Sequence, residues 1–396
     1  MSADTHALSS VPAAELDGVL ALRAVLRAGL DAEVYPRQVC YVPAGDGAEL
    51  SFVHGLPGTS GLGPVTFAQD KRMRRGLLER NGVPVPSSAT FTIGKGVKAA
   101  KRTASILGYP VVVKPAVGDN GIETFRDIHD DAGIDAALEY LRNPTSEREG
   151  FNRSAYGLTE LREPGEENGR IVVPPGYMFM VEKQLEGEYL RILVSDGEVR
   201  SIVRCHGAPS DGSMTGGEDV TEDAHEDVRG LALRASAGLP GLGLCSIDMV
   251  VPDVTAPFEE STVGVVEFSE RAGLSVQAKV DPALAERLSE EVVHRYASAS
   301  GWTVAEPIGE VDVAFEAHSL PDPDRGGEAI AAAATAIGLA SEITRIDTLG
   351  GLVEGRFSGE AGLIARLTNE LLDGDVEQQS VMLVVLRPLT GAHSGM

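Results

Sequence analysis

The chain of 396 residues is long enough for two or three domains that each bury a hydrophobic core. Hydrophobic residues make up 43% and charged residues 23%, which excludes a disordered chain, and the 46 glycines follow no Gly-X-Y period, which excludes a collagen-like one. The net charge of −25 argues against general binding to nucleic acid or to an anionic membrane, because both need clustered lysines and arginines.

The cysteines and the apolar runs indicate the compartment. Cys40, Cys205 and Cys245 are scattered and form no CxxC pair, so neither a disulfide framework nor a cysteine zinc site is expected. The first residues lack the basic and apolar regions of a signal peptide, and the longest uncharged apolar run, 329–340, is too short to cross a bilayer. We therefore expect a soluble cytoplasmic protein.

Residues 1–69 are predicted to form an N-terminal α/β subdomain. Apolar residues spaced for one helix face run from Leu16 to Leu26, and Gly29 ends the pattern. Short β-like runs follow at 33–42 and 50–54. The Gly- and Pro-rich stretch 55–64 is typical of a loop or linker.

Residues 70–177 alternate helix and strand patterns. A helix is predicted from Asp70 to just before Gly82, and further elements are predicted at 89–93 (strand), 97–107 (helix), 111–114 (strand) and 134–141 (helix). From Pro144 to Pro175 no period is found. A segment of that length without a pattern is usually a functional lid or disordered.

Residues 178–304 are β-rich, and the tail 305–396 has an order of its own. The first region is predicted to contain a helix at 226–237 and apolar strands at 244–251 and 263–269. The tail is predicted as strand, helix, strand, strand, helix, strand, at 311–317, 328–339, 342–349, 352–357, 361–372 and 381–386. This βαββαβ order suggests a ferredoxin-like two-layer module, a scaffold that implies no function and that could make the chain a homodimer.

Lys114 ends the apolar β run in VVVKPAVGDNG, and Gly118 and Gly121 bracket the turn after it. A lysine at a strand end beside a glycine loop can hold a polyphosphate, because the ammonium supplies a point charge and the loop supplies backbone N–H donors. A surface lysine before a turn explains the same residues equally well. No GxxxxGK[ST] occurs, so a Walker A loop is excluded.

Asp248 and Glu267 are acids within the apolar runs LCSIDMVV and VGVVEFSE. Burying an isolated carboxylate is costly unless a cation or a donor compensates. We expect the two strands to pair as a hairpin, with Glu267 and Ser269 on one face and Val266 and Phe268 on the other. Two acids on one face would suit Mg²⁺, which keeps waters and substrate phosphates as its other ligands. Acids solvated at a sheet edge are the alternative.

The segment MVEKQLEGEYLR is an extended run that a glycine interrupts. Its backbone groups could hydrogen-bond an adenine edge through four residues, Glu182, Lys183, Gln184 and Leu185. Glu188 or Glu186 could then reach a ribose hydroxyl, and Arg191 and Arg204 could stabilise a phosphoryl or acyl-phosphate anion. A β-meander with charged exposed faces accounts for any one of these residues alone.

In their order along the chain, these segments resemble the ATP-grasp superfamily over roughly residues 50–280. They are similar to its carboxylate–amine ligases, such as cyanophycin synthetase and the D-alanine–D-alanine ligases. The segments are DK at 70–71, GVPVP, GYPVVVKPAVGDNG, VEKQLEGEYLR, CSIDMVV and VVEFSERAGL. The resemblance implies an ATP-grasp fold with a small lobe at 70–177 and a large lobe at 178–304. Together with the N-terminal subdomain and the ferredoxin-like tail that the element order predicts, the expected fold class is α/β and α+β.

The resemblance also implies a role for individual residues. The nucleotide phosphates would be contacted by Lys71, Lys114 and the loop from Gly118 to Gly121. The adenine would be held by the stretch from Glu182 to Leu185, and the ribose by Glu188. The magnesium ligands would be Asp248 and Glu267, with Ser269.

Three departures from the family pattern bear on these roles. Ser269 stands where the family has Asn, and Glu123 stands where a further glycine is common. The spacing before Arg191 leaves the ribose acid open between Glu188 and Glu186.

The implied activity is an ATP- and Mg²⁺-dependent ligase that joins a small-molecule carboxylate, through an acyl phosphate, to an amine. The substrates would be amino acids or short peptides. Arg191, Arg204 and Arg271 are the catalytic candidates, with Arg271 near the loops that would select the substrate. Gly118 to Gly121 and the segment 144–175 are the lid candidates. The alternatives are an ATP-grasp phosphotransferase or carboxylase, and a non-catalytic nucleotide sensor.

Overall fold

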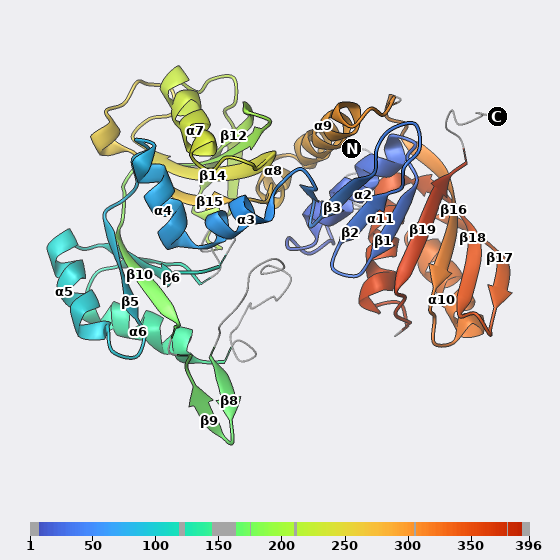
Figure 1. Ribbon diagram of the computed structural model, residues 1–396, viewed down its shortest axis with the longest axis horizontal. Helices are drawn as coiled ribbons and strands as arrows, with labels where there is room; N and C mark the ends of the chain where they lie inside the picture. The colour runs from blue at the N-terminus through green and yellow to red at the C-terminus, as the bar shows by residue number, and fades with distance from the viewer. Residues whose placement is uncertain are drawn as a thin grey trace. The chain divides into compact units, whose positions relative to one another are not determined.

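The computed structural model describes residues 8–118, 123–144, 164–174, 176–209, 212–304, 306–377 and 379–389. The chain divides into two compact units, of which the first combines Met1–Gly58 with Asp281–Met396 and the second is Thr59–Val280 (Figure 1). This division differs from the expected boundaries after residues 69, 177 and 304. The reason is that strands from both ends of the chain share one sheet.

The first unit is built on an eight-stranded antiparallel sheet with the order β17-β18-β16-β19-β1-β2-β3-β4. Its strands are β1 (Ala32–Tyr35), β2 (Val39–Val42), β3 (Leu50–Val53), β4 (Leu56–Pro57), β16 (Glu310–His318), β17 (Ala340–Asp347), β18 (Leu352–Glu360) and β19 (Leu383–Pro388). Its helices are α2 (Leu16–Arg27), α9 (Pro282–Ala299), α10 (Pro323–Ala336) and α11 (Ala361–Asp373). The tail has the expected βαββαβ order, but β19 also pairs with β1, so its sheet continues into the N-terminal strands.

The second unit contains a four-stranded sheet, β5-β10-β6-β7, and a five-stranded sheet, β13-β12-β11-β14-β15. The first half of the unit comprises α3 (Leu62–Gln69), α4 (Lys71–Arg80), β5 (Ser88–Thr92), α5 (Val97–Leu107), β6 (Val111–Pro115), β7 (Phe125–Ile128), α6 (Asp131–Arg142), β8 (Gly165–Glu167), β9 (Arg170–Val172) and β10 (Met178–Lys183). The second half comprises β11 (Glu188–Ser195), β12 (Glu198–His206), β13 (Gly216–Asp219), α7 (Glu226–Gly238), β14 (Leu244–Val251), a 3-10 turn (Glu260–Thr262), β15 (Gly264–Ser269) and α8 (Ser275–Val280).

The segment 144–175 was expected to be without regular structure, but part of it forms β strands. Strands β8 and β9 form a two-stranded antiparallel hairpin there. Residues 145–163 and 175, which the same expectation covers, lie outside the described residues.

Helices α5 and α6 cover one face of the four-stranded sheet. Val111 and Val113 of β6, with Phe179 and Val181 of β10, pack against these helices in one buried cluster. Because side chains alternate along a strand, the residues between them point to the opposite face. That opposite face carries Lys114.

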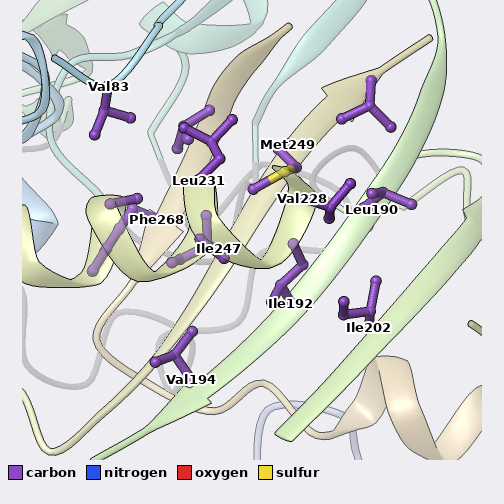
Figure 2. Packing of buried hydrophobic residues seen from close by; sticks show 14 of the residues in the cluster. Val83, Leu190, Ile192, Val194, Ile202, Val228, Leu231, Ile247, Met249 and Phe268 are labelled. Atoms are coloured by element: carbon purple, nitrogen blue, oxygen red, sulfur yellow. The ribbon is translucent and has the colours of Figure 1, made fainter. Parts of the chain in front are cut away.

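Helix α7 covers one face of the five-stranded sheet in the same way. Figure 2 shows Val228 and Leu231 of α7 packed against Leu190 and Ile192 of β11 and against neighbouring residues of β14. The intervening residues of β11 and β14, among them Arg191 and Asp248, therefore lie on the other face.

Candidate functional site

Two acids lie side by side on the face of the five-stranded sheet that α7 leaves open. Asp248 on β14 is directly opposite Glu267 on β15 in the antiparallel register, and both side chains are buried. The predicted hairpin is therefore present, and it brings together the two carboxylates that were expected to act as a pair.

A β-bulge beside these acids changes one detail of the prediction. The register shifts between Asp248 and Met249, so that Met249 faces Val265 and Val266 is the extra residue. Val266 packs with Tyr189 and its neighbours and not with Phe268, which belongs to the core under α7. The expectation that Val266 and Phe268 share a face was wrong, because simple alternation does not hold across a bulge.

Lys114 reaches this bulge from the four-stranded sheet. Its Nζ lies 2.9 Å from Glu182 Oε1 and donates a 3.0 Å hydrogen bond to the carbonyl oxygen of Val266. Lys114 is paired in register with Met180 on β10, and its side chain is buried. The strand lysine and the hairpin of the two acids thus meet, as the sequence predicted.

The first turn of α4 supplies two more cations, Lys71 and Arg74. Asp70 caps the helix by accepting from the backbone N–H of Arg72, and the N–H of Lys71 bonds the carbonyl of Ala116 at 2.9 Å. Lys71 Nζ donates to the Gly118 carbonyl oxygen at 2.8 Å. These bonds fix the start of α4 against the segment that follows Lys114.

Arg74 forms an ion pair with Glu267. Burial alone raises the pKa of the Glu267 carboxyl, but the charges of Arg74, Lys71 and Lys114 outweigh it and lower that pKa to about 2. Glu267 is therefore an ionised carboxylate held among three cations. Arg74 was not predicted, although its i, i+3 spacing from Lys71 places both on one helix face.

Asp248 has a cation of its own. Arg191, opposite it on β11, contacts Oδ1 through Nε and Oδ2 through Nη2, the latter at 2.9 Å. Tyr189 donates from its hydroxyl to the same Oδ2 at 2.8 Å. The Asp248 carboxylate raises the pKa of Arg191 despite the burial of the guanidinium.

Two hollows adjoin at Lys114, Glu182 and Glu267. One, of about 290 Å³, is also lined by Lys71, Arg74, Arg75, Leu78, Val85, Met180, Val265 and Val266. The other, of about 340 Å³, is also lined by Val112, Thr124, Arg126, Lys183, Gln184, Leu185, Tyr189, Val250 and Val266. Both volumes include space open to solvent. The whole stretch expected to hold the adenine, Glu182 to Leu185, lines the second hollow.

Glu188 and Arg204 are not brought to this site. Glu188 shares the α7 face of the sheet with Leu190 and accepts from the backbone N–H of Val254 at 2.6 Å. Arg204, opposite Leu190 in register, bonds Glu188 at 3.0 Å and also contacts Glu218. The structure therefore contradicts both assignments, that of Glu188 as the ribose acid and that of Arg204 as a catalytic residue.

The remaining candidates have mixed outcomes. Ser269 lies opposite Ser246 on β14, and its hydroxyl accepts from the backbone N–H of Arg271 at 3.3 Å. Arg271 is buried and lies two residues after the end of β15. Gly118, with φ of 134°, accepts the Lys71 bond through its carbonyl. Gly121 lies outside the described residues.

The donor chemistry of Asp248 and Glu267 fits Mg²⁺ in one arrangement. They offer carboxylate oxygens at paired positions on one face, and Mg²⁺ is often bound by one or two carboxylates plus substrate phosphates. An ion there would share these oxygens with Arg191 and Arg74. Within the ranges that the structure describes, no three His, Cys, Asp or Glu side chains gather to hold a metal, so the fit requires ligands from a phosphate.

No family model matches the chain. The chain is 25% identical over 280 residues to cyanophycin synthetase from Crocosphaera subtropica (strain ATCC 51142 / BH68), a similarity that covers 60% of this chain and 31% of that protein. The chain thus spans about a third of the length of this relative. The similarity confirms the resemblance to ATP-grasp carboxylate–amine ligases that the motif order predicted.

Two of the solved structures to which the chain is similar are enzymes. One is a bifunctional glutathione synthetase from Pasteurella multocida, with 16% identity, a TM-score of 0.44, and coverage of 72% of this chain and 44% of that one. The other is D-alanine–D-alanine ligase from Bacillus anthracis, with 17% identity, a TM-score of 0.42, and coverage of 61% of this chain and 69% of that one.

Across the described ranges, no helix has the length and apolar character needed to span a membrane.

Proposed function

We propose that the chain is an ATP-dependent carboxylate–amine ligase that forms an amide bond and releases ADP and phosphate. The observation that carries this proposal is the ionised Glu267 carboxylate, surrounded by Lys71, Arg74 and Lys114 at the junction of two hollows. Opposite charges at close range in a largely buried site suit a polyphosphate with its divalent ion. The similarity to cyanophycin synthetase supports the same reaction class.

The reaction has two balanced steps. A substrate carboxylate oxygen attacks the γ-phosphorus of ATP, the bond to the β-phosphate oxygen breaks, and ADP leaves with an acyl phosphate in place. An amine nitrogen then attacks the acyl carbon, the bond to the phosphate oxygen breaks, and inorganic phosphate leaves with the amide formed. Mg²⁺, when bound, neutralises phosphate charge.

The residues of the chain act in this scheme by position and charge. Lys114 and Lys71 hold the phosphates, and the stretch from Glu182 to Leu185 holds the adenine in the hollow beside it. Asp248 and Glu267 hold the metal, with the Ser269 hydroxyl at the third position. Arg191 and Arg271 lie next to these residues and would stabilise the acyl phosphate and select the substrates, which we expect to be amino acids or short peptides.

A non-catalytic nucleotide sensor is the second candidate. Ser269 in place of a stronger metal ligand, together with the Arg191 contact to Asp248, favours it, because both features weaken a metal site. A sensor would bind ATP without hydrolysis that a substrate stimulates. A phosphotransferase or carboxylase would instead yield a stable phosphorylated product or require bicarbonate.

A coupled ADP-release screen with amino acids in pairs tests the proposal. The expected result is ADP release that needs both a carboxylate and an amine, with an amide product identified by mass spectrometry. ATP binding without any substrate-stimulated ADP release would support the sensor. Absence of ATP binding would contradict both candidates.

A further inference from the structure

Two residues in one wall of the hollow beside Glu182 to Leu185 have no role assigned above. Thr124, the residue before β7, and Arg126, within β7, line this wall together with Tyr189 of β11. The wall matters because Glu188, the acid expected at the sugar of the nucleotide, does not line the hollow. A sugar bound in this hollow therefore contacts side chains other than Glu188.

Arg126 contributes a positive charge to this wall. Its guanidinium carbon lies 5.5 Å from the centroid of the Tyr189 ring, a cation–π contact that holds the side chain against β11. A guanidinium has donors only, so a ligand that meets it must supply acceptors. The phosphate oxygens of a nucleotide are acceptors that also carry the opposite charge.

Thr124 contributes a hydroxyl that is 9% exposed. Its Oγ1 has no hydrogen-bond partner among the residues that the structure describes. A buried polar group without a hydrogen-bond partner is unfavourable, so this hydroxyl gains free energy when a ligand bonds it. A hydroxyl both donates and accepts, which matches the hydroxyls and phosphate oxygens of a nucleotide.

The acids that line the hollow are already engaged. Glu182 contacts Lys114 and Glu267 pairs with Arg74, so the wall around Thr124 offers a hydroxyl and a cation and no free carboxylate. We propose that Thr124 and Arg126 bind the sugar–phosphate part of the nucleotide, Arg126 through its charge on a phosphate and Thr124 through a hydrogen bond. This inference rests on the proposed function, which supplies the nucleotide.

Titration calorimetry of the full chain with ADP and with adenosine, both in MgCl₂, tests the pair. Arg126→Met is expected to weaken ADP about tenfold or more and to change adenosine less than about twofold, since adenosine lacks phosphate, and Arg126→Lys is expected to fall between. Thr124→Val is expected to weaken ADP about fivefold, and Thr124→Ser to restore it. Arg234→Met is the matched control, because Arg234 is an exposed arginine on α7 that pairs with Glu260 outside the hollow.

The outcomes separate this inference from the proposed function. Wild-type protein that fails to bind ADP overturns both. Wild-type protein that binds ADP, with Arg126→Met and Thr124→Val binding it equally well, overturns this inference alone. An Arg126→Met variant that loses ADP and adenosine to the same degree also overturns it, since the guanidinium would then shape the hollow and not meet a phosphate. Thermal melts establish whether each variant is folded. If Arg126→Met does not fold, the ADP and adenosine affinities of Arg126→Lys provide the same test.

Discussion

Arg191 and Asp248 lie opposite each other on adjacent strands, and the guanidinium of Arg191 contacts both oxygens of the Asp248 carboxylate. Both side chains are buried. A buried pair of this kind offers little net stability over an apolar pair, but removing one partner leaves an uncompensated charge in a poorly solvated place. The pair therefore fixes the Asp248 carboxylate in position on the face of the sheet that α7 leaves open.

Arg191→Met should destabilise the second unit by about 3–5 kcal/mol, because it leaves the Asp248 carboxylate buried without its cation. Chemical denaturation monitored by circular dichroism measures this change in the free energy of unfolding. The double variant Arg191→Met/Asp248→Asn should recover much of the loss, since it removes the stranded charge. A loss below about 1 kcal/mol in the single variant would contradict a buried ion pair.

The depressed pKa of Glu267 predicts a pH dependence of stability. The folded-state pKa, about 2, lies below the ordinary value of 4.5, so ionised Glu267 stabilises the fold above about pH 4.5. That contribution, on the order of 3 kcal/mol, is lost as the pH falls from about 4.5 to about 2.

Glu267→Gln should remove this part of the acid sensitivity. The free energy of unfolding, measured by urea titration at several pH values between about 6 and about 2.5, gives the difference between wild type and variant. This difference in the free energy of unfolding should become smaller as the pH falls. A difference that stays constant over this pH range would show that Glu267 has an ordinary pKa.

Lys114→Met should lower ADP release about 100-fold or more, because one positioned charge at a transferring phosphoryl group is lost. Glu267→Gln should act in the same direction through loss of a metal-binding carboxylate. Lys101→Met is the control: Lys101 pairs with Asp135 at the exposed surface of α5 and α6. Equal turnover of Lys114→Met and Lys101→Met would show that Lys114 does not take part in the reaction.

Arg204→Met should leave ADP release within about twofold of wild type, in contrast to the catalytic role expected for Arg204 from the sequence. The side chain lies on the α7 face of the sheet and is partly exposed, so its ion pairs are worth about 1 kcal/mol or less. The coupled ADP-release assay checks this directly. A large loss of turnover would show that Arg204 acts in the reaction despite its place on the α7 face.

The sequence was sufficient for the positions of Lys114, Asp248 and Glu267. Lys114 follows Val111 and Val113, and the same alternation that buries these valines under helices turns the lysine to the other face. The two acids could be predicted because each is a single charge in an otherwise apolar strand, and antiparallel pairing then brings them together.

The sequence was insufficient where alternation carries no information. Alternation places Glu188 and Arg191 on opposite faces of β11. Because the strand is buried on both faces, the pattern EYLRILVS does not indicate which of the two faces carries the site. The bulge at Val266 depends on how β15 pairs, which residue types alone do not specify. Arg74 is one of several basic residues in α4, and only packing decides which of them is buried.

The pairing of β1 with β19 has a consequence for biosynthesis. The ribosome delivers Thr59–Val280 in full before it makes β16 and β19, so the inserted unit can complete its folding while the strands before it still await their neighbours. During that interval the nascent chain carries an open β edge at Ala32–Tyr35, the kind of edge that invites contact with other nascent chains or with a chaperone.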